Sequence, residues 1–253
     1  YERVDGLVGS EMCIRDSPNI ELLLNNEYAC LMLKMELHDL AIPHFQKVLK
    51  MMRSVPYKPV RHWHFTYNHI ANAYYKMGNL DSTILYRRKA LPVLRYRKSR
   101  PMFASTYNNI GMNYQEYGMH DSALVNFRKA YKILTTPFTV DRPFLQSLID
   151  NHGLLFVKLG ELDSAVVWFE KNILLADSLN DTWRILQTRL ELAGIALARK
   201  NWKQCGDLLR DVADKLPSLA PKTPRLNELK HKLFTLRGQY HFAMGKYLSL
   251  IHI

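Results

Sequence analysis

The side chains best suited to chemistry in this sequence are amides, amines and one carboxylate that recur in three similar stretches. Asn carries both a hydrogen-bond donor and an acceptor, so a row of such residues can pair with the backbone of an extended peptide whatever its sequence. The charged members would select particular side chains or a terminal carboxylate. The candidate binding residues are Asn68, Asn72 and Lys76, then Asn108, Asn109 and Gln115, then Asp150, Asn151 and Lys158.

These amides also have a plainer interpretation, in which Asn on an exposed helix face is merely polar. Asn is a poor helix former, however. Asn68 and Asn108 occupy the same place in the related stretches TYNHIANAYYKMG and TYNNIGMNYQEYG. Recurrence of an unfavourable residue at matching positions favours a binding role, and the plainer interpretation stays open beside it.

Catalytic motifs are missing from the sequence. It contains no Gly-rich phosphate loop after a strand, no G-x-S-x-G and no H-E-x-x-H. His62 and His64 lie two residues apart, so on a helix they diverge and cannot jointly bind a metal. We therefore predict a protein that is not an enzyme and has neither a cofactor nor a metal site.

The elements that must position the candidate residues are clearest between Thr106 and Ala130. The spacing predicts one helix from about Pro101 to Tyr117 and a second from about Asp121 to Leu134. On each helix, the residues that share one face are three or four positions apart. These structural residues are Tyr107, Ile110, Gly111 and Tyr114 on the first helix, and Ala123, Phe127 and Ala130 on the second.

Small residues allow the two helices of this pair to approach closely. Gly111 and Ala123 are expected at the crossing, with Tyr107, Tyr114 and Phe127 filling the space around it. Gly in the middle of a helix costs about 1 kcal/mol relative to Ala, so its presence needs such a packing reason. Gly118 stands where the first helix should end and can adopt the left-handed conformation that closes a helix.

This order and spacing resembles the tetratricopeptide repeat (TPR), a helix–turn–helix unit. Related stretches recur along the chain, with small residues Ala29, Ala71, Gly111, Gly153 and Ala193 spaced by 42, 40, 42 and 40 residues. The long period is similar to the TPR arrays of kinesin light chains and of bacterial sensor and regulator proteins. We expect an array over residues 18–247, with repeats at about 22–55, 62–97, 102–136, 144–178 and 184–216 and a partial repeat at 225–247.

The resemblance implies an all-α solenoid, a right-handed superhelix of antiparallel helix hairpins. In such arrays the first helix of each repeat lines the concave face. The nine candidate residues fall on inward-pointing positions of those helices, which implies a peptide- or protein-binding groove. The pattern departs from the chaperone-type carboxylate clamp, which needs more Lys and Arg on the inner face. The bacterial arrays further suggest the sensing or docking part of a larger regulatory protein, with a fused effector domain outside this sequence.

The charge balance leaves other functions open. The formal net charge is +12, and the densest basic run is Arg87, Arg88 and Lys89 followed by Arg95, Arg97, Lys98 and Arg100. Such a surface could bind nucleic acid, although exposed helix faces collect Lys and Arg for solubility alone. A structural spacer without a ligand is the remaining alternative. No apolar run is long enough to span a bilayer, and the compartment stays open, with the cytoplasm favoured.

The two ends of the chain differ from the rest. Residues 1–17 contain LVGSEMCIRDS, which resembles a translated sequencing-adapter read-through, and residues 248–253 (LSLIHI) resemble its companion. We interpret both segments as non-native. On this interpretation the chain is a fragment of a longer protein.

Overall fold

The computed structural model describes residues 18–54, 60–96, 99–135, 141–219 and 224–245. These residues form an all-α fold of eleven α-helices and one 3₁₀ turn, Leu216–Ser218. The terminal segments that we interpret as non-native, and the connector at residues 55–59, lie outside the described residues. The helices are α2 (Pro18–Lys34), α3 (His38–Ser54), α4 (Val60–Lys76), α5 (Leu80–Tyr96), α6 (Arg100–Glu116), α7 (His120–Thr135), α8 (Arg142–Lys158), α9 (Leu162–Ser178), α10 (Thr182–Ala198), α11 (Trp202–Lys215) and α12 (Pro224–Ala243).

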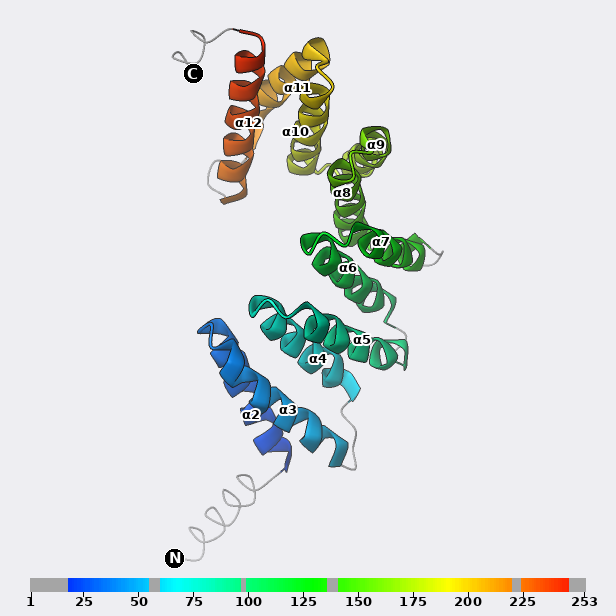
Figure 1. Ribbon diagram of the computed structural model, residues 1–253, viewed down its shortest axis with the longest axis vertical. Coiled ribbons are helices and arrows are strands. Elements are labelled where there is room, and N and C mark those ends of the chain that lie inside the picture. Colours follow the sequence, from blue (N-terminus) through cyan, green and yellow to red (C-terminus); the bar gives the residue numbers. More distant parts are fainter. Residues whose placement is uncertain (1–17, 55–59, 97–98, 136–140, 220–223, 246–253) are drawn as a thin grey trace, which may run out of the picture. The chain divides into compact units, whose positions relative to one another are not determined.

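The helices pack as consecutive hairpins within two compact units (Figure 1). The first unit ends at Leu134 and the second begins at Thr135. In the first unit α2 packs on α3, α4 on α5, and α5 also contacts α6. In the second unit α8 packs on α9 and α10 on α11, while α12 covers both α10 and α11. Each hairpin therefore buries its apolar faces against its own partner and against a neighbouring hairpin.

Glycines end the first helix of three hairpins. Gly78, Gly118 and Gly160 have φ angles of 75°, 74° and 76°, in the left-handed region that residues with a Cβ rarely adopt. At the central hairpin Gly118 N donates to Gln115 O (3.2 Å) and Met119 N donates to Tyr114 O (2.8 Å). This pair of bonds satisfies carbonyls that the end of α6 would otherwise leave unpaired. The predicted role of Gly118 is confirmed.

The predicted close crossing is confirmed at the same hairpin. A Cβ added to Gly111 would lie 2.5 Å from Phe127 Cδ1 and 3.2 Å from the carbonyl oxygen of Ala123. In the second unit a Cβ on Gly153 would lie 2.5 Å from Phe169 Cε1. The glycine thus makes room for an aromatic ring of the facing helix, which is why both rings are fully buried.

Two residues expected around the crossing are less enclosed than Phe127. Tyr107 and Tyr114 are half-buried, because each ring lies at a surface hollow beside the hairpin. The helices themselves end within one residue of the predicted positions, since α6 covers Arg100–Glu116 and α7 covers His120–Thr135. The repeat boundaries and the right-handed superhelix stay predictions.

Candidate binding site

A hollow of about 270 Å³ opens between α4 and α6 in the first unit, with α5 contributing one residue. We call it the A-helix hollow, because α4 and α6 are the first helices of two successive hairpins. Three of the nine predicted binding residues, Asn72, Lys76 and Asn109, lie together in its lining. The other lining residues are Tyr75, Arg87, Met112, Asn113 and Glu116.

Arg87 is the charged residue that α5 contributes to this hollow. The residue is only 6% exposed. Its Nε donates to Asn113 Oδ1 (2.8 Å) and its Nη2 donates to Asn72 Oδ1 (2.9 Å), so the guanidinium links the two A helices. Burial lowers the pKa of Arg87 to about 10, and the group therefore stays cationic at neutral pH.

The remaining charges of the A-helix hollow lie closer to solvent. Tyr75 donates its hydroxyl hydrogen to Glu116 Oε2, and this hydrogen bond, together with burial, raises the pKa of Tyr75. Lys76 and Glu116 are exposed. With Arg87 and Lys76 positive and Glu116 negative, the lining carries two positive charges and one negative charge, a net charge of +1.

The equivalent residues Asn68, Asn108 and Asp150 lie deeper than we expected for a binding face. Asn108 and Asp150 are each 6% exposed, and Asn68 is half-buried with its Oδ1 fully enclosed and without a hydrogen-bond partner. Asn108 makes a weak contact from Nδ2 to Met112 Sδ at 3.5 Å. Among the others, Gln115 and Asn151 are half-buried and Lys158 is exposed.

Asp150 is held in a buried polar network of the second unit. Its Oδ2 pairs with Arg184 Nη1 at 2.9 Å, and its Oδ1 accepts from Asn172 Nδ2 at 2.9 Å. Asn172 Nδ2 also contacts Thr188 Oγ1 at 3.3 Å. Burial raises the pKa of Asp150 although Arg184 acts in the opposite direction. The network joins α8, α9 and α10, so the carboxylate holds these helices together.

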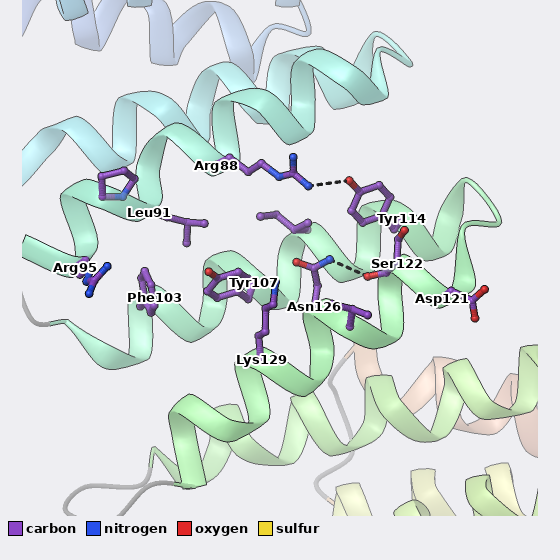
Figure 2. Close-up of a pocket in the computed structure, with 13 residues that line it drawn as sticks. Arg88, Leu91, Arg95, Phe103, Tyr107, Tyr114, Asp121, Ser122, Asn126 and Lys129 are labelled. Atoms are coloured by element: carbon purple, nitrogen blue, oxygen red, sulfur yellow. Dashed lines mark hydrogen bonds between the residues drawn. The ribbon is translucent and has the colours of Figure 1, made fainter.

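A larger hollow of about 700 Å³ is lined by residues of α5, α6 and α7 (Figure 2). We call it the B-helix hollow. Arg88 Nη2 donates to Tyr114 Oη at 3.4 Å across it, and the Lys129 ammonium lies 5.6 Å from the centre of the Tyr107 ring. Its lining is Arg88, Leu91, Pro92, Arg95, Phe103, Tyr107, Ile110, Tyr114, Asp121, Ser122, Val125, Asn126 and Lys129.

Sequence reasoning missed the B-helix hollow because it assigned Tyr107 and Tyr114 entirely to the core. The phenol hydroxyls were the available signal, since a Tyr at a packing position usually keeps its polar end near solvent or a partner. Part of the basic run noted in the sequence, Arg88 and Arg95, does line this hollow. Arg87 from the same run lines the A-helix hollow instead.

Neither a metal-binding cluster nor a membrane-spanning helix is found in the described part of the chain. There, His, Cys, Asp and Glu residues form no group of three with the spacing of metal ligands. The search covers His64, whose ring is buried, while the side chain of His62 lies outside the described residues. None of the described helices is both long and apolar enough to cross a bilayer.

The solved structures most useful for comparison share this fold at low sequence identity. The apo form of the quorum sensor NprR from B. thuringiensis superposes with a TM-score of 0.69 and 19% identity, over 93% of this chain and 64% of that one. A putative kinesin light chain with TPR-like repeats from Podosopora anserina superposes with a TM-score of 0.61 and 14% identity, over 79% of this chain and 96% of that one. A Rap protein complexed with competence and sporulation factor superposes with a TM-score of 0.55 and 13% identity, over 92% of this chain and 72% of that one.

The sequence comparisons agree with the fold. No curated protein matches the sequence. Residues 64–136, which cover α5, α6, α7 and all but the first four residues of α4, match the tetratricopeptide repeat family. The same glycine-ended turns and small-residue crossings continue in the second unit. Residues 64–136 are therefore a tetratricopeptide repeat segment, and the described chain has a TPR-like fold, similar in structure to kinesin-light-chain-like repeats and to the bacterial Rap and NprR proteins.

Proposed function

We propose that this chain is a non-catalytic scaffold that binds a peptide or a protein segment, and that it is the sensing or docking region of a larger regulatory protein. The observation that carries the proposal is the A-helix hollow, which brings the predicted residues Asn72, Lys76 and Asn109 into one lining. The Rap protein that shares the fold was solved in complex with competence and sporulation factor. That complex supports ligand binding by this architecture.

Two of the three amides that line the hollow suit an extended peptide. Asn72 uses its Oδ1 to accept from Arg87, which leaves its Nδ2 hydrogens to donate to a ligand carbonyl. Asn109 is half-buried in the same lining and offers both a donor and an acceptor. Backbone donors and acceptors repeat regularly along an extended peptide. Two amides, one on α4 and one on α6, can therefore bind the peptide backbone whatever its side chains are.

The other predicted residues take different parts in this proposal. Asn108 and Asp150 are buried and Asn68 is half-buried, and these residues would position the A helices. Gln115 would extend the contact surface in the first unit. On the second unit, Asn151 and Lys158 of α8 would offer a contact surface of their own.

A peptide-library pull-down at low and high salt tests the proposal. We expect the wild type to enrich peptides at both salt concentrations, and the Asn72→Ala/Asn109→Ala double variant to lose the enrichment. Asn227→Ala changes an exposed Asn of α12 and is the matched control, which should bind like the wild type. Equal enrichment by the wild type and the double variant would contradict a peptide site in the A-helix hollow.

Nucleic-acid binding is a second candidate because the B-helix hollow combines Arg88, Arg95 and Lys129 with three aromatic rings. Basic side chains and stackable rings are the two ingredients of single-strand recognition. Binding through this surface would weaken steeply with salt and would be lost in an Arg88→Gln/Arg95→Gln/Lys129→Gln variant. A spacer without a ligand would bind neither peptide nor single-stranded oligonucleotide in either assay.

A further inference from the structure

We propose that the A-helix hollow binds a carboxylate through Arg87, so that the ligand is a peptide recognised by its free C terminus or by an Asp or Glu side chain. The proposal rests on the peptide-binding function above and specifies the chemical class of the ligand. Both sources present the same planar anion, and the experiment below separates them.

The first argument is that Arg87 is a buried cation without an anion. It is the one Arg or Lys among the buried residues of the described ranges. None of the seven ion pairs found there includes it. Its two partners, Asn72 and Asn113, are neutral amides, which orient the guanidinium but do not neutralise it. Burying an unpaired charge is costly, so this charge needs a reason.

The second argument is the position of Arg87 in the repeat. The equivalent positions of the neighbouring repeats hold Phe45, Phe127 and Phe169, all fully buried. Complete burial of a Phe side chain stabilises a fold by about 1.5–3 kcal/mol, and the hairpin of α4 and α5 forgoes this gain. Where a residue departs from the packing rule that its neighbours follow, function is the usual reason.

The third argument is the geometry of the donors. A guanidinium has five N–H groups in a planar fork that matches the two oxygens of a carboxylate. Two of the five are used, by Asn113 and Asn72, and Arg87 lines the hollow where a ligand would enter. The Nδ2 of Asn72 stands beside the same fork and can donate to the same anion.

The charge around the hollow favours an anion with a single charge. Lys76 adds a second cation at the exposed edge, and Glu116 in the same lining adds a negative charge. The Tyr75 hydroxyl holds Glu116 by a hydrogen bond. A carboxylate would bring the net charge of the lining to zero, whereas a phosphate dianion would leave it negative and would meet Glu116.

The test uses a library of random nonapeptides made in two forms, with a free C-terminal carboxylate and with a C-terminal amide. The proteins are the wild type, Arg87→Gln, Arg87→Phe and Arg88→Gln. The Arg87→Phe variant restores the aromatic residue of the neighbouring repeats and is expected to fold, which circular dichroism checks. Arg88→Gln removes the same charge from the adjacent residue, which lines the B-helix hollow, and is the matched control.

We expect the wild type and Arg88→Gln to prefer peptides with a carboxylate by about tenfold or more, the size of a charge-assisted hydrogen bond. A preference confined to the free-acid library identifies a C-terminal carboxylate, and selection of Asp or Glu in both libraries identifies a side chain. Both Arg87 variants should lose the preference and keep weaker binding to neutral peptides that depends on Asn109.

Three results would overturn the proposal. The first is wild-type binding that requires Asn72 and Asn109 but shows no preference for carboxylates, which would leave the peptide-binding function standing. The second is a carboxylate preference that survives in Arg87→Gln. The third is the absence of any peptide enrichment by the wild type, which would contradict the carboxylate site and the proposed function together.

Discussion

Among the described residues, each unit buries one Arg, Lys, Asp or Glu side chain where three helices meet, and the partners of these two side chains differ. In the first unit Arg87 of α5 reaches Asn72 of α4 and Asn113 of α6, both neutral. In the second unit Asp150 of α8 accepts from Asn172 of α9 and pairs with the cation of Arg184 of α10. Burial favours the neutral form of each group, so it lowers the pKa of Arg87 and raises the pKa of Asp150.

The presence of a counter-ion distinguishes the two charges. Asp150 is paired within the fold, whereas the proposal above leaves Arg87 to pair with a ligand. Asp150 has its counter-ion inside the fold, so its network can join helices without any ligand. Arg87 has hydrogen bonds that fix its direction but no charge of opposite sign, and it lines a hollow. We therefore infer a structural role for Asp150, whose network joins three helices, whereas the proposal above gives Arg87 a role in recognition. The following predictions test that contrast, from the largest expected effect to the smallest.

Arg184→Met should destabilise the second unit most. It leaves the Asp150 carboxylate buried without a cation, and breaking a buried pair in this way costs about 3–5 kcal/mol. The midpoint of urea unfolding, followed by circular dichroism, would measure the loss. Arg210→Met removes an exposed partner of Asp207, 3.5 Å away, and as the control should cost about 1 kcal/mol or less. Equal effects of the two variants would show that the Asp150 network does not brace the unit.

Gly111→Ala and Gly153→Ala should destabilise the two units to a similar extent. In each case the new methyl group would lie 2.5 Å from a buried Phe ring, and overpacking of this kind costs about 1–3 kcal/mol. Gly194→Ala is the control, because its nearest neighbour would be Leu236 Cδ2 at 3.9 Å. There the better helix propensity of Ala should stabilise by up to about 1 kcal/mol. Thermal unfolding of the three variants measures the difference, and destabilisation by Gly194→Ala would contradict the packing explanation.

The helix hairpins could be predicted from the sequence because their signals are local. A glycine that ends α6 and small residues spaced for a helix crossing can be recognised without knowing which helices are neighbours. The two polar networks could not be predicted in this way. Arg87 was recognisable as a departure from the aromatic position, but its partners Asn72 and Asn113 come from two different hairpins.

The placement of the candidate binding residues could be predicted only in part, for the same reason. Asn72, Lys76 and Asn109 do share a hollow. Asn108 and Asp150 occupy the same repeat position as Asn68 but are buried. A helical repeat fixes which face a residue is on, while its depth depends on the size of side chains on the facing helices. In the second unit these side chains are Asn172 and Arg184, which turn Asp150 into an internal residue.

Arg87→Phe/Asn113→Ala should make the first unit more stable and less selective. The pair replaces a buried cation and its buried amide partner by Phe, as in Phe127, and by Ala, as in Ala73. Asn72 also loses its bond to Arg87, but its side chain is exposed and can bond to water instead. Replacing a buried polar group by well-packed apolar residues is neutral or stabilises by about 1–4 kcal/mol, and we expect about 1–2 kcal/mol here. Urea unfolding measures stability, and the two peptide libraries measure the loss of carboxylate preference. Arg87→Phe alone should be less stable than the double variant, because Asn113 would remain buried without its partner.

The smallest effect concerns pH and belongs to Asp150. Its pKa in the folded protein is raised by burial above the ordinary value of 3.8, so the folded state holds this proton more tightly than the unfolded chain. The resulting stabilisation is complete below pH 3.8 and is lost as the pH rises through the folded pKa. Relative to Asp150→Asn, which has no proton to release, the wild type should therefore gain stability as the pH falls through that window. Urea unfolding at closely spaced pH values measures the difference in unfolding free energy between the two proteins. The contributions of the other carboxylates largely cancel in this difference, because both proteins contain them. A wild type that instead loses stability relative to Asp150→Asn on acidification would mean that the attraction of Arg184 outweighs burial, and Asp150 would then be a stabilising ion pair rather than a tolerated charge.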